Sequence, residues 1–232
     1  IQNVSSATGN HSSQAVGVAR AIKYYGKKAV AISSTGEAAT SEGYVYEAIN
    51  GASREQLPVI FVIQDNGYGI SVPKEVQTAN RKVAENFVGI KNLKIIYCNG
   101  RDVFESMNAM TEAREYAIET GCPVIVQANC VRIGSHSNSD KQTLYRDENE
   151  LMYTQAADPM GKFRRMLLRY KRFTDEELLK IESDAKKELN EAHRKVIVAP
   201  DPDPKTIFDF VVPEPYHPQV YKNGVHSEEG EK

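Results

Sequence analysis

Val59-Ile60-Phe61-Val62-Ile63-Gln64-Asp65-Asn66, residues 59–66, is the stretch of sequence that decides the fold. Its first five residues are all apolar, and four of them are β-branched. A strand with one solvated face alternates apolar and polar side chains, so this unbroken run predicts a strand that is buried on both faces. Such strands are typical of parallel sheets that carry helices on both sides. The polar residues from 64 onward mark the carboxyl end of the strand.

The segments around this strand alternate between strand and helix character. Apolar runs predict further strands at residues 29–33, 93–98 and 124–130. The spacing of apolar residues predicts helices at residues 14–25, 44–52 and 102–119. The last of these helices is expected to bury one face, formed by Val103, Met107, Met110 and Ala117. The alternation predicts an α/β protein with a doubly wound parallel sheet.

The sequence changes character after Ser135. Residues 134–142 are polar and lack periodicity, which predicts a loop. Asp158-Pro159 is typical of a helix N-cap followed by its first residue, and residues 174–177, Thr-Asp-Glu-Glu, form a capping box. We therefore predict an α/β domain over residues 1–156, a C-terminal helical segment of the same domain over 157–199, and a proline-rich segment with a tail or linker over 200–232.

Composition places the chain among ordinary globular proteins. Its 232 residues are 41% hydrophobic and 26% charged, and the net charge is −2. This charge gives no reason to expect nucleic acid or an anionic membrane as a partner. No apolar run approaches the roughly 18 residues that span a bilayer. The cysteines, Cys98, Cys122 and Cys130, form no C-x-x-C pair and are expected to be reduced thiols.

Two clusters of polar and small residues follow neighbouring strands. Glu37 stands in a loop of small residues, Gly36 to Ala39, after the predicted strand 29–33, and Asn66 follows the next strand. Ligands of open α/β sheets bind at the carboxyl ends of the strands, where backbone N–H groups can approach a diphosphate. Each cluster alone is more often a surface turn. Together they favour one shared magnesium ion, which takes carboxylate, amide and phosphate oxygens.

These motifs resemble the α chain of the decarboxylating first component of 2-oxo acid dehydrogenase complexes, in the branched-chain and pyruvate group. The family signature, Gly-Asp/Glu-Gly followed after a spacer by Asn-Asn, appears here as residues 36–38 and 65–66. The resemblance implies the thiamine-diphosphate-binding fold with C-terminal helices. It implies that magnesium is held by Glu37, Asn66 and the Tyr68 carbonyl. It also implies that thiamine diphosphate lies along Gly36, Ala38 and Ala39.

Two further regions resemble the same family. Residues 131–140, Val-Arg-Ile-Gly-Ser-His-Ser-Asn-Ser-Asp, are similar to a loop that borders its active site. The resemblance implies that Arg132 lies near the diphosphate and that His136 contacts cofactor and intermediates as the catalytic proton carrier. Ser137 matches a serine that kinases phosphorylate in animal members. Residues 3–17 resemble the segment near the aminopyrimidine ring, which points to Ser6 and Thr8.

The chain departs from the family pattern at several positions. Ala38 replaces the second glycine of the signature, Asp65 replaces the first asparagine, and Lys141 replaces a loop aspartate, while Gln64 stands where some branched-chain members have an arginine. The family's N-terminal region is missing, including an arginine that contacts the diphosphate. The glutamate that activates the cofactor belongs to the β partner. We therefore expect a fragment of a longer polypeptide that is inactive alone.

The resemblance implies an enzyme that decarboxylates a branched-chain 2-oxo acid and transfers the acyl group to lipoamide. The expected partners are a β chain or fused β half and the lipoyl domain of the acyltransferase component. Glu37, in place of the commoner aspartate, favours the branched-chain group over the alternative, a pyruvate or acetoin dehydrogenase α chain. A non-catalytic relative that serves as an assembly surface is the alternative of another class. The expected location is the bacterial cytoplasm, or the mitochondrial matrix for a eukaryotic chain.

Overall fold

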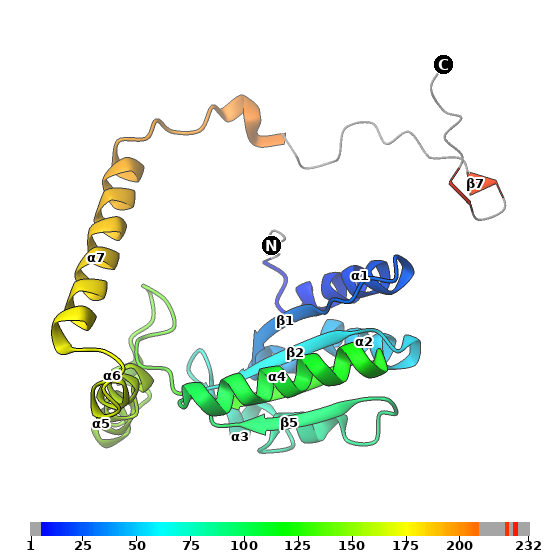
Figure 1. Cartoon of the computed structure of the whole chain (residues 1–232), viewed down its shortest axis with the longest axis horizontal. Helices are drawn as coiled ribbons and strands as arrows, with labels where there is room; N and C mark the ends of the chain where they lie inside the picture. Colours follow the sequence, from blue (N-terminus) through cyan, green and yellow to red (C-terminus); the bar gives the residue numbers. More distant parts are fainter. Residues whose placement is uncertain (1–5, 209–220, 223–224, 227–232) are drawn as a thin grey trace. The chain divides into compact units, whose positions relative to one another are not determined.

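The computed structural model describes residues 6–208, 221–222 and 225–226. It divides into two compact units, one up to Phe173 and one from Thr174. The first unit is an α/β layer structure, in which four parallel strands form a sheet with the order β1-β2-β6-β5 (Figure 1). These strands are β1 (Ala31–Gly36), β2 (Val59–Asp65), β5 (Lys94–Cys98) and β6 (Val124–Asn129).

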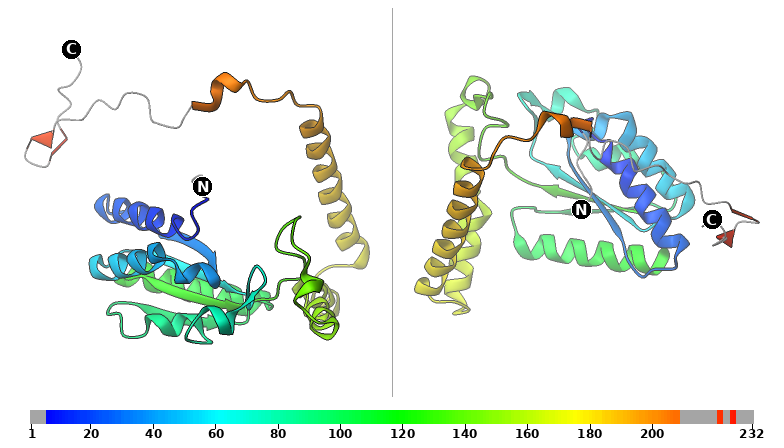
Figure 2. Two further views of the ribbon diagram at one scale, coloured as in Figure 1. Left: turned by 180° about the vertical axis from the view of Figure 1, so that it is seen from behind. Right: turned by 90° about the horizontal axis from the view of Figure 1, so that it is seen from above.

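Helices cover both faces of this sheet, as the sequence predicts (Figure 2). One face packs against α1 (His11–Tyr24) and α2 (Gly43–Glu55), and its core includes Val59, Phe61 and Ile63. The opposite face, with Ile60, packs against α4 (Val103–Thr120). Successive residues of β2 therefore enter different cores, which explains why the whole run is apolar.

The inward face of helix α4 agrees with the prediction at Ala117, which is buried, and at Met110, which packs against the core, but not at Met107. A stripe of alanines, Ala109, Ala113 and Ala117, is buried against the sheet, whereas Met107 is 59% exposed. The alanines recur every four residues and let the helix approach the strands closely. Met107 lies two residues before this stripe, on the opposite side of the helix, so its predicted inward position is wrong.

Smaller elements follow the strands at their carboxyl ends and carry the candidate site. They are η1 (Ala38–Ser41), β3 (Tyr68–Gly69), β4 (Val72–Pro73), α3 (Lys74–Gln77), η2 (Val83–Phe87) and η3 (Gln142–Leu144). Two helices complete the first unit, α5 (Glu148–Ala156), which the sequence did not reveal, and α6 (Pro159–Arg169). Asp158 caps α6 and Pro159 is its first residue, which confirms the prediction.

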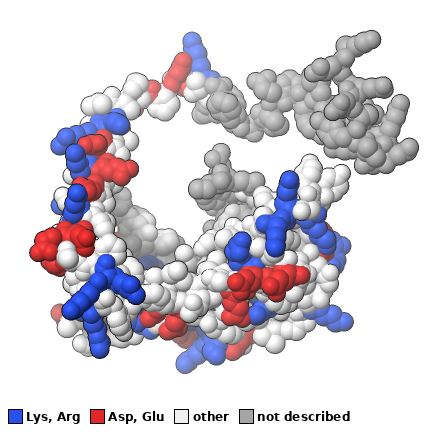
Figure 3. Space-filling model, viewed as in Figure 1, with Lys and Arg blue, Asp and Glu red and all other residues white. Residues whose placement is uncertain are grey.

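The second unit contains α7 (Asp175–Ile197), η4 (Pro204–Phe208) and the short strands β7 (Tyr221–Lys222) and β8 (Val225–His226). Thr174 and Glu177 form the capping box predicted for α7. The predicted apolar stretch at 208–212 and most of the tail lie outside the described residues. No helix among the described residues is long and apolar enough to cross a membrane. On the face drawn in Figure 3, basic and acidic side chains are interspersed.

Candidate functional site

The two predicted clusters meet at one edge of the sheet. Strands β1 and β2 are parallel neighbours, and Gly36 pairs with Gln64 in their register. Glu37 and Asn66 follow these strands directly, and Glu37 Oε2 accepts a hydrogen bond from the Asn66 backbone N–H at 3.1 Å. The Asn66 side chain turns toward the next residues, because its Oδ1 accepts from the Tyr68 N–H at 3.2 Å. Glu37, Asn66 and Tyr68 therefore form one cluster, which we call the clamp.

Glu37 is the most unusual member of the clamp. Its side chain is buried, with 1% exposure, and Oε1 has no hydrogen-bond partner among the described residues. Burial raises the pKa of the Glu37 carboxyl above its usual range, and hydrogen bonds from its own and the Asn66 backbone oppose this rise. A buried carboxylate oxygen without a partner is costly in a folded protein. A bound cation would satisfy it, so the clamp fits a hard metal ion.

The loop of small residues that follows β1 is fixed from two sides. Within the loop, Thr40 Oγ1 donates to the Glu37 carbonyl at 2.6 Å. From outside, Gln77 Nε2 donates to the Ala38 carbonyl at 3.0 Å and to the Ser41 hydroxyl. Gln77 could not be predicted from the sequence, because it lies 39 positions from Ala38 and no local motif connects the two.

Ala38, which replaces the second glycine of the signature, fits because its neighbour across the two loops is Gly69. A Cβ atom added to Gly69 would lie 2.7 Å from the Ala38 Cβ, closer than two carbon atoms can approach. The two residues therefore form a complementary pair, in which the methyl group of Ala38 fills the space that a side chain at 69 would need. The loops after β1 and β2 are in direct contact at this point.

Asp65, the other substitution in the signature, is paired rather than free. It is buried and forms a salt bridge with Lys74 Nζ at 2.8 Å. Gln127 Nε2 also donates to its carboxylate, at 2.7 Å. The negative charge that replaces asparagine is thus balanced by a lysine nine residues later.

The N-terminal segment lies beside the same loop. Gly9 has a φ of +81°, and a Cβ there would meet Val45 Cγ2 at 3.0 Å and the Ala39 carbonyl oxygen at 3.5 Å. This close contact requires glycine. Ser6 and Thr8, the residues predicted to approach the aminopyrimidine, are exposed just before it. Their role in cofactor binding stays a prediction.

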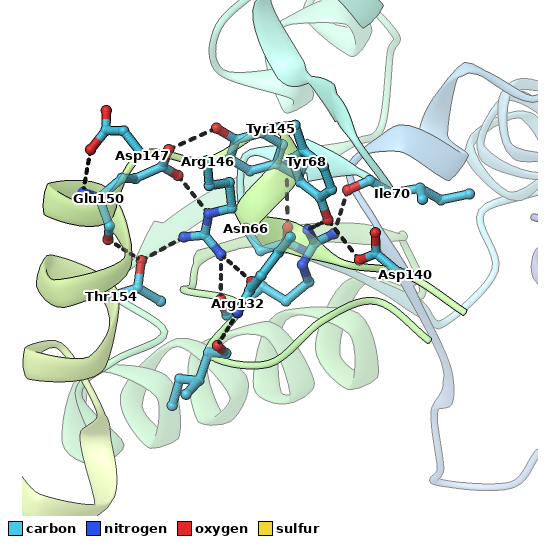
Figure 4. Close-up of polar contacts among 12 residues, drawn as sticks. Asn66, Tyr68, Ile70, Arg132, Asp140, Tyr145, Arg146, Asp147, Glu150 and Thr154 are labelled. Carbon is cyan, nitrogen blue, oxygen red and sulfur yellow. Dashed lines mark hydrogen bonds and ion pairs between the residues drawn. The ribbon is translucent and has the colours of Figure 1, made fainter. Parts of the chain in front are cut away.

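The second predicted region, residues 131–140, is followed by an irregular segment and η3 up to the start of α5, and we call residues 131–147 the histidine loop. Arg132 connects the start of this loop to the residues that follow β2, because its NH1 donates a hydrogen bond to the Ile70 carbonyl at 2.8 Å (Figure 4). Its NH2 donates a hydrogen bond to the Tyr145 hydroxyl at 2.6 Å. The guanidinium also lies over the Tyr68 ring, 5.5 Å from its centroid. Its Nε is buried without a partner among the described residues.

Arg146 is the buried anchor of the histidine loop. Its guanidinium bonds to Glu150 Oε1 at 2.8 Å, to Thr154 Oγ1 at 2.6 Å and to the Arg132 carbonyl at 2.8 Å (Figure 4). Glu150 in turn accepts from the Tyr68 hydroxyl at 3.0 Å. Helix α5, which supplies Glu150 and Thr154, therefore connects the end of the loop to the clamp.

His136 projects from this framework with an exposed side chain. Only its backbone is held, by a hydrogen bond from its N–H to Asp140 Oδ2 at 2.7 Å. Hydrogen bonds from Tyr145 and from this backbone hold the pKa of the Asp140 carboxyl below its usual value. Ser137 is also exposed, and its hydroxyl contacts that of Ser139 at 3.1 Å. The catalytic role predicted for His136 requires such an accessible imidazole.

No cluster of three or more His, Cys, Asp or Glu side chains occurs among the described residues. A metal ion at the clamp would have the Glu37 carboxylate, the Asn66 amide and the Tyr68 carbonyl as its predicted protein ligands. Its remaining ligands would have to come from elsewhere. Phosphate oxygens are the usual complement in magnesium sites of this kind.

Comparison with known proteins identifies the family of the chain. Residues 1–205 match the family described as Dehydrogenase E1 component. The chain belongs to this family. It is 37% identical over 190 residues to the pyruvate dehydrogenase E1 component subunit alpha of Bacillus subtilis, which covers 81% of the chain and 50% of that protein. It is 33% identical over 212 residues to the mitochondrial 2-oxoisovalerate dehydrogenase subunit alpha of Pan troglodytes, which covers 91% and 47%.

The match confirms the predicted membership of the Dehydrogenase E1 component family and the predicted fold. Enzymes of this family depend on thiamine diphosphate. The Staphylococcus aureus pyruvate dehydrogenase E1 component subunit alpha, 38% identical over 155 residues, aligns with 66% of the chain and 42% of its own length. The chain thus spans about half the length of these relatives.

Proposed function

We propose that the chain is the cofactor-holding α part of a 2-oxo acid dehydrogenase and acts together with a β chain or β half. The clamp is the observation that carries this proposal. It joins a buried, unsatisfied carboxylate to an amide at the ends of neighbouring strands, in a chain of the Dehydrogenase E1 component family. The names of the relatives, which are alpha subunits, support the proposed partner chain.

In this proposal Glu37, the Asn66 amide oxygen and the Tyr68 carbonyl hold magnesium, and residues 36–39 lie along the diphosphate. Gln77 holds residues 36–39 in place by donating a hydrogen bond to the Ala38 carbonyl. Bound thiamine diphosphate would supply the electron sink for decarboxylation of the 2-oxo acid. His136 would carry a proton during acyl transfer to the lipoyl group, for which an exposed imidazole is suited.

The choice of 2-oxo acid rests on two opposed observations. Glu37 in the clamp motivates the branched-chain assignment. The names of the relatives at 37% and 38% identity, which are pyruvate dehydrogenase subunits, favour pyruvate. We keep the branched-chain acid as the proposed substrate and pyruvate as its direct competitor in the test.

Reconstitution with a β chain tests the function. We expect decarboxylation of 2-oxoisovalerate or pyruvate, coupled to acylation of a lipoyl domain, with the better substrate identified by the ratio of kcat/KM values. His136→Asn should lower acyl transfer about 100-fold, the usual contribution of a proton carrier. It should lower the affinity for thiamine diphosphate far less than it lowers acyl transfer, because His136 is not among the residues proposed to hold magnesium or the diphosphate. The exposed Ser139→Ala variant serves as the control in the same loop.

A non-catalytic assembly role is the competing proposal, motivated by Ala38 and Asp65. The structure shows how both substitutions are accommodated, by Gly69 and by Lys74. They therefore give little support to a relaxed site. Absence of turnover with every 2-oxo acid tested in the reconstituted enzyme would favour the assembly role. We expect the active enzyme in the bacterial cytoplasm.

A further inference from the structure

A second cleft, distinct from the clamp, opens at the carboxyl ends of β2, β5 and β6. Its volume is about 480 Å³, which lies within the range of small-molecule sites. None of the residues predicted to hold thiamine diphosphate or magnesium lines it. The side chains that matter for its chemistry are Asp65, Lys74, Arg81, Lys82, Tyr97 and Arg101.

The cleft is positively charged, although the chain as a whole carries −2. Four cationic residues line it against two acidic ones, Asp65 and Glu105, so its formal charge is +2. Asp65 is neutralised by Lys74, whose side chain is only 16% exposed. Glu105 Oε2 accepts a hydrogen bond from the Asn99 backbone N–H at 3.1 Å. Arg81, Lys82 and Arg101 form no ion pair with any described residue, and Glu105 is the one lining carboxylate that is not in an ion pair there.

Each of these three cations is placed for a ligand. Arg81 is exposed and makes no hydrogen bond or ion pair with any residue that the structure describes. Lys82 Nζ lies 5.1 Å from the centroid of the Tyr97 ring. Arg101 is oriented by neutral acceptors, with Nε 3.1 Å from Asn99 Oδ1 and NH1 2.9 Å from the Tyr153 hydroxyl. These contacts fix the direction of Arg101 without cancelling its charge.

We propose that this cationic cleft binds a small phosphate monoester. Guanidinium groups match pairs of phosphate oxygens, and ammonium groups add charge. A phosphate monoester carries a charge of about −1.5 to −2 at neutral pH, which matches the formal charge of +2 in the cleft better than a monocarboxylate does. The cleft is larger than one phosphate group, and the half-exposed ring of Tyr97 offers an apolar wall for the organic part. The inference does not depend on the cofactor proposed for the clamp.

Calorimetric titration of phenyl phosphate into the full chain tests the inference. Thiamine diphosphate and magnesium are present in excess, so that any cofactor site is filled. We expect saturable binding that Arg81→Ala weakens at least about tenfold, because a charge-assisted hydrogen bond is lost. Arg81 has no partner whose loss would disturb folding. The matched control is Arg114→Ala, an exposed arginine on α4 outside the cleft, which should bind phenyl phosphate as the unmodified chain does.

Benzoate, which has the same ring and a single negative charge, is titrated in parallel and should bind at least about tenfold more weakly. Three results would each overturn the inference. They are the absence of saturable binding, equal binding of benzoate and phenyl phosphate, and equal weakening by the Arg81 and Arg114 variants. A parallel titration omits thiamine diphosphate, and saturable binding that occurs only in its absence would also overturn the inference, since the cleft would then be the cofactor site.

Discussion

The clamp and the histidine loop lie at the same end of the sheet but are built in opposite ways. In the clamp the functional side chain itself is buried, and Glu37 Oε1 is left unsatisfied. In the histidine loop the buried group is the anchor, Arg146, and His136, the predicted proton carrier, is exposed. A buried carboxylate oxygen without a partner suits a small cation. An exposed imidazole on an anchored loop would suit a large, transient substrate such as the proposed lipoyl group.

Removing the anchor should produce the largest effect on folding. Arg146→Ala removes the guanidinium that bonds to Glu150, Thr154 and the Arg132 carbonyl and opens a space beside α5. We expect the free energy of unfolding to fall by about 2–4 kcal/mol, because several charge-assisted hydrogen bonds are lost while Glu150 is 32% exposed. Denaturant titration followed by circular dichroism measures this change. Arg114→Ala, on the exposed side of α4, should stay within about 0.5 kcal/mol. An equally small effect of Arg146→Ala would show that the loop is not anchored in this way.

The contact between the two clamp loops can be tested with a double-mutant cycle. Gly69→Ala should destabilise the protein by about 1–3 kcal/mol, because its new methyl group overlaps that of Ala38. Ala38→Gly should largely restore stability in the double variant, and the interaction energy from urea unfolding reports the coupling. Gly51→Ala on α2 has open space around its Cβ and should instead be neutral or stabilising. Additive effects at 38 and 69 would contradict the proposed pairing.

The smallest effect on folding concerns the charge of Glu37. Because its folded-state pKa is raised, protonation of Glu37 favours folding below the ordinary pKa of about 4.5, and this contribution is lost as pH rises through the folded-state value. Glu37→Gln should therefore raise the free energy of unfolding by about 1 kcal/mol at pH 7 without metal. Glu115→Gln, on the exposed side of α4, should have no effect. A pH-independent change at position 37 would contradict the buried charge.

The position of the clamp could be predicted from the sequence. Glu37 and Asn66 each follow an apolar strand, and the carboxyl ends of neighbouring parallel strands lie at the same edge of the sheet. The anchoring of the histidine loop could not be predicted, because it depends on contacts such as that of Tyr68 with Glu150, 82 positions apart. The prediction for α4 is wrong at Met107, because small alanine side chains, and not this large apolar one, let the helix pack closely on the sheet.

Calorimetric titration of thiamine diphosphate into the chain combined with a β chain tests the central claim most directly. The titration is run with and without magnesium, on the unmodified chain and on Glu37→Ala. The account predicts magnesium-dependent binding that Glu37→Ala weakens by at least about 100-fold, since loss of a metal ligand should exceed the effect of its outer-shell partners. Affinity should fall at acidic pH, because the raised pKa of Glu37 lets protons compete with the metal. Absence of binding, or equal binding by Glu37→Ala, would contradict the assignment of the clamp.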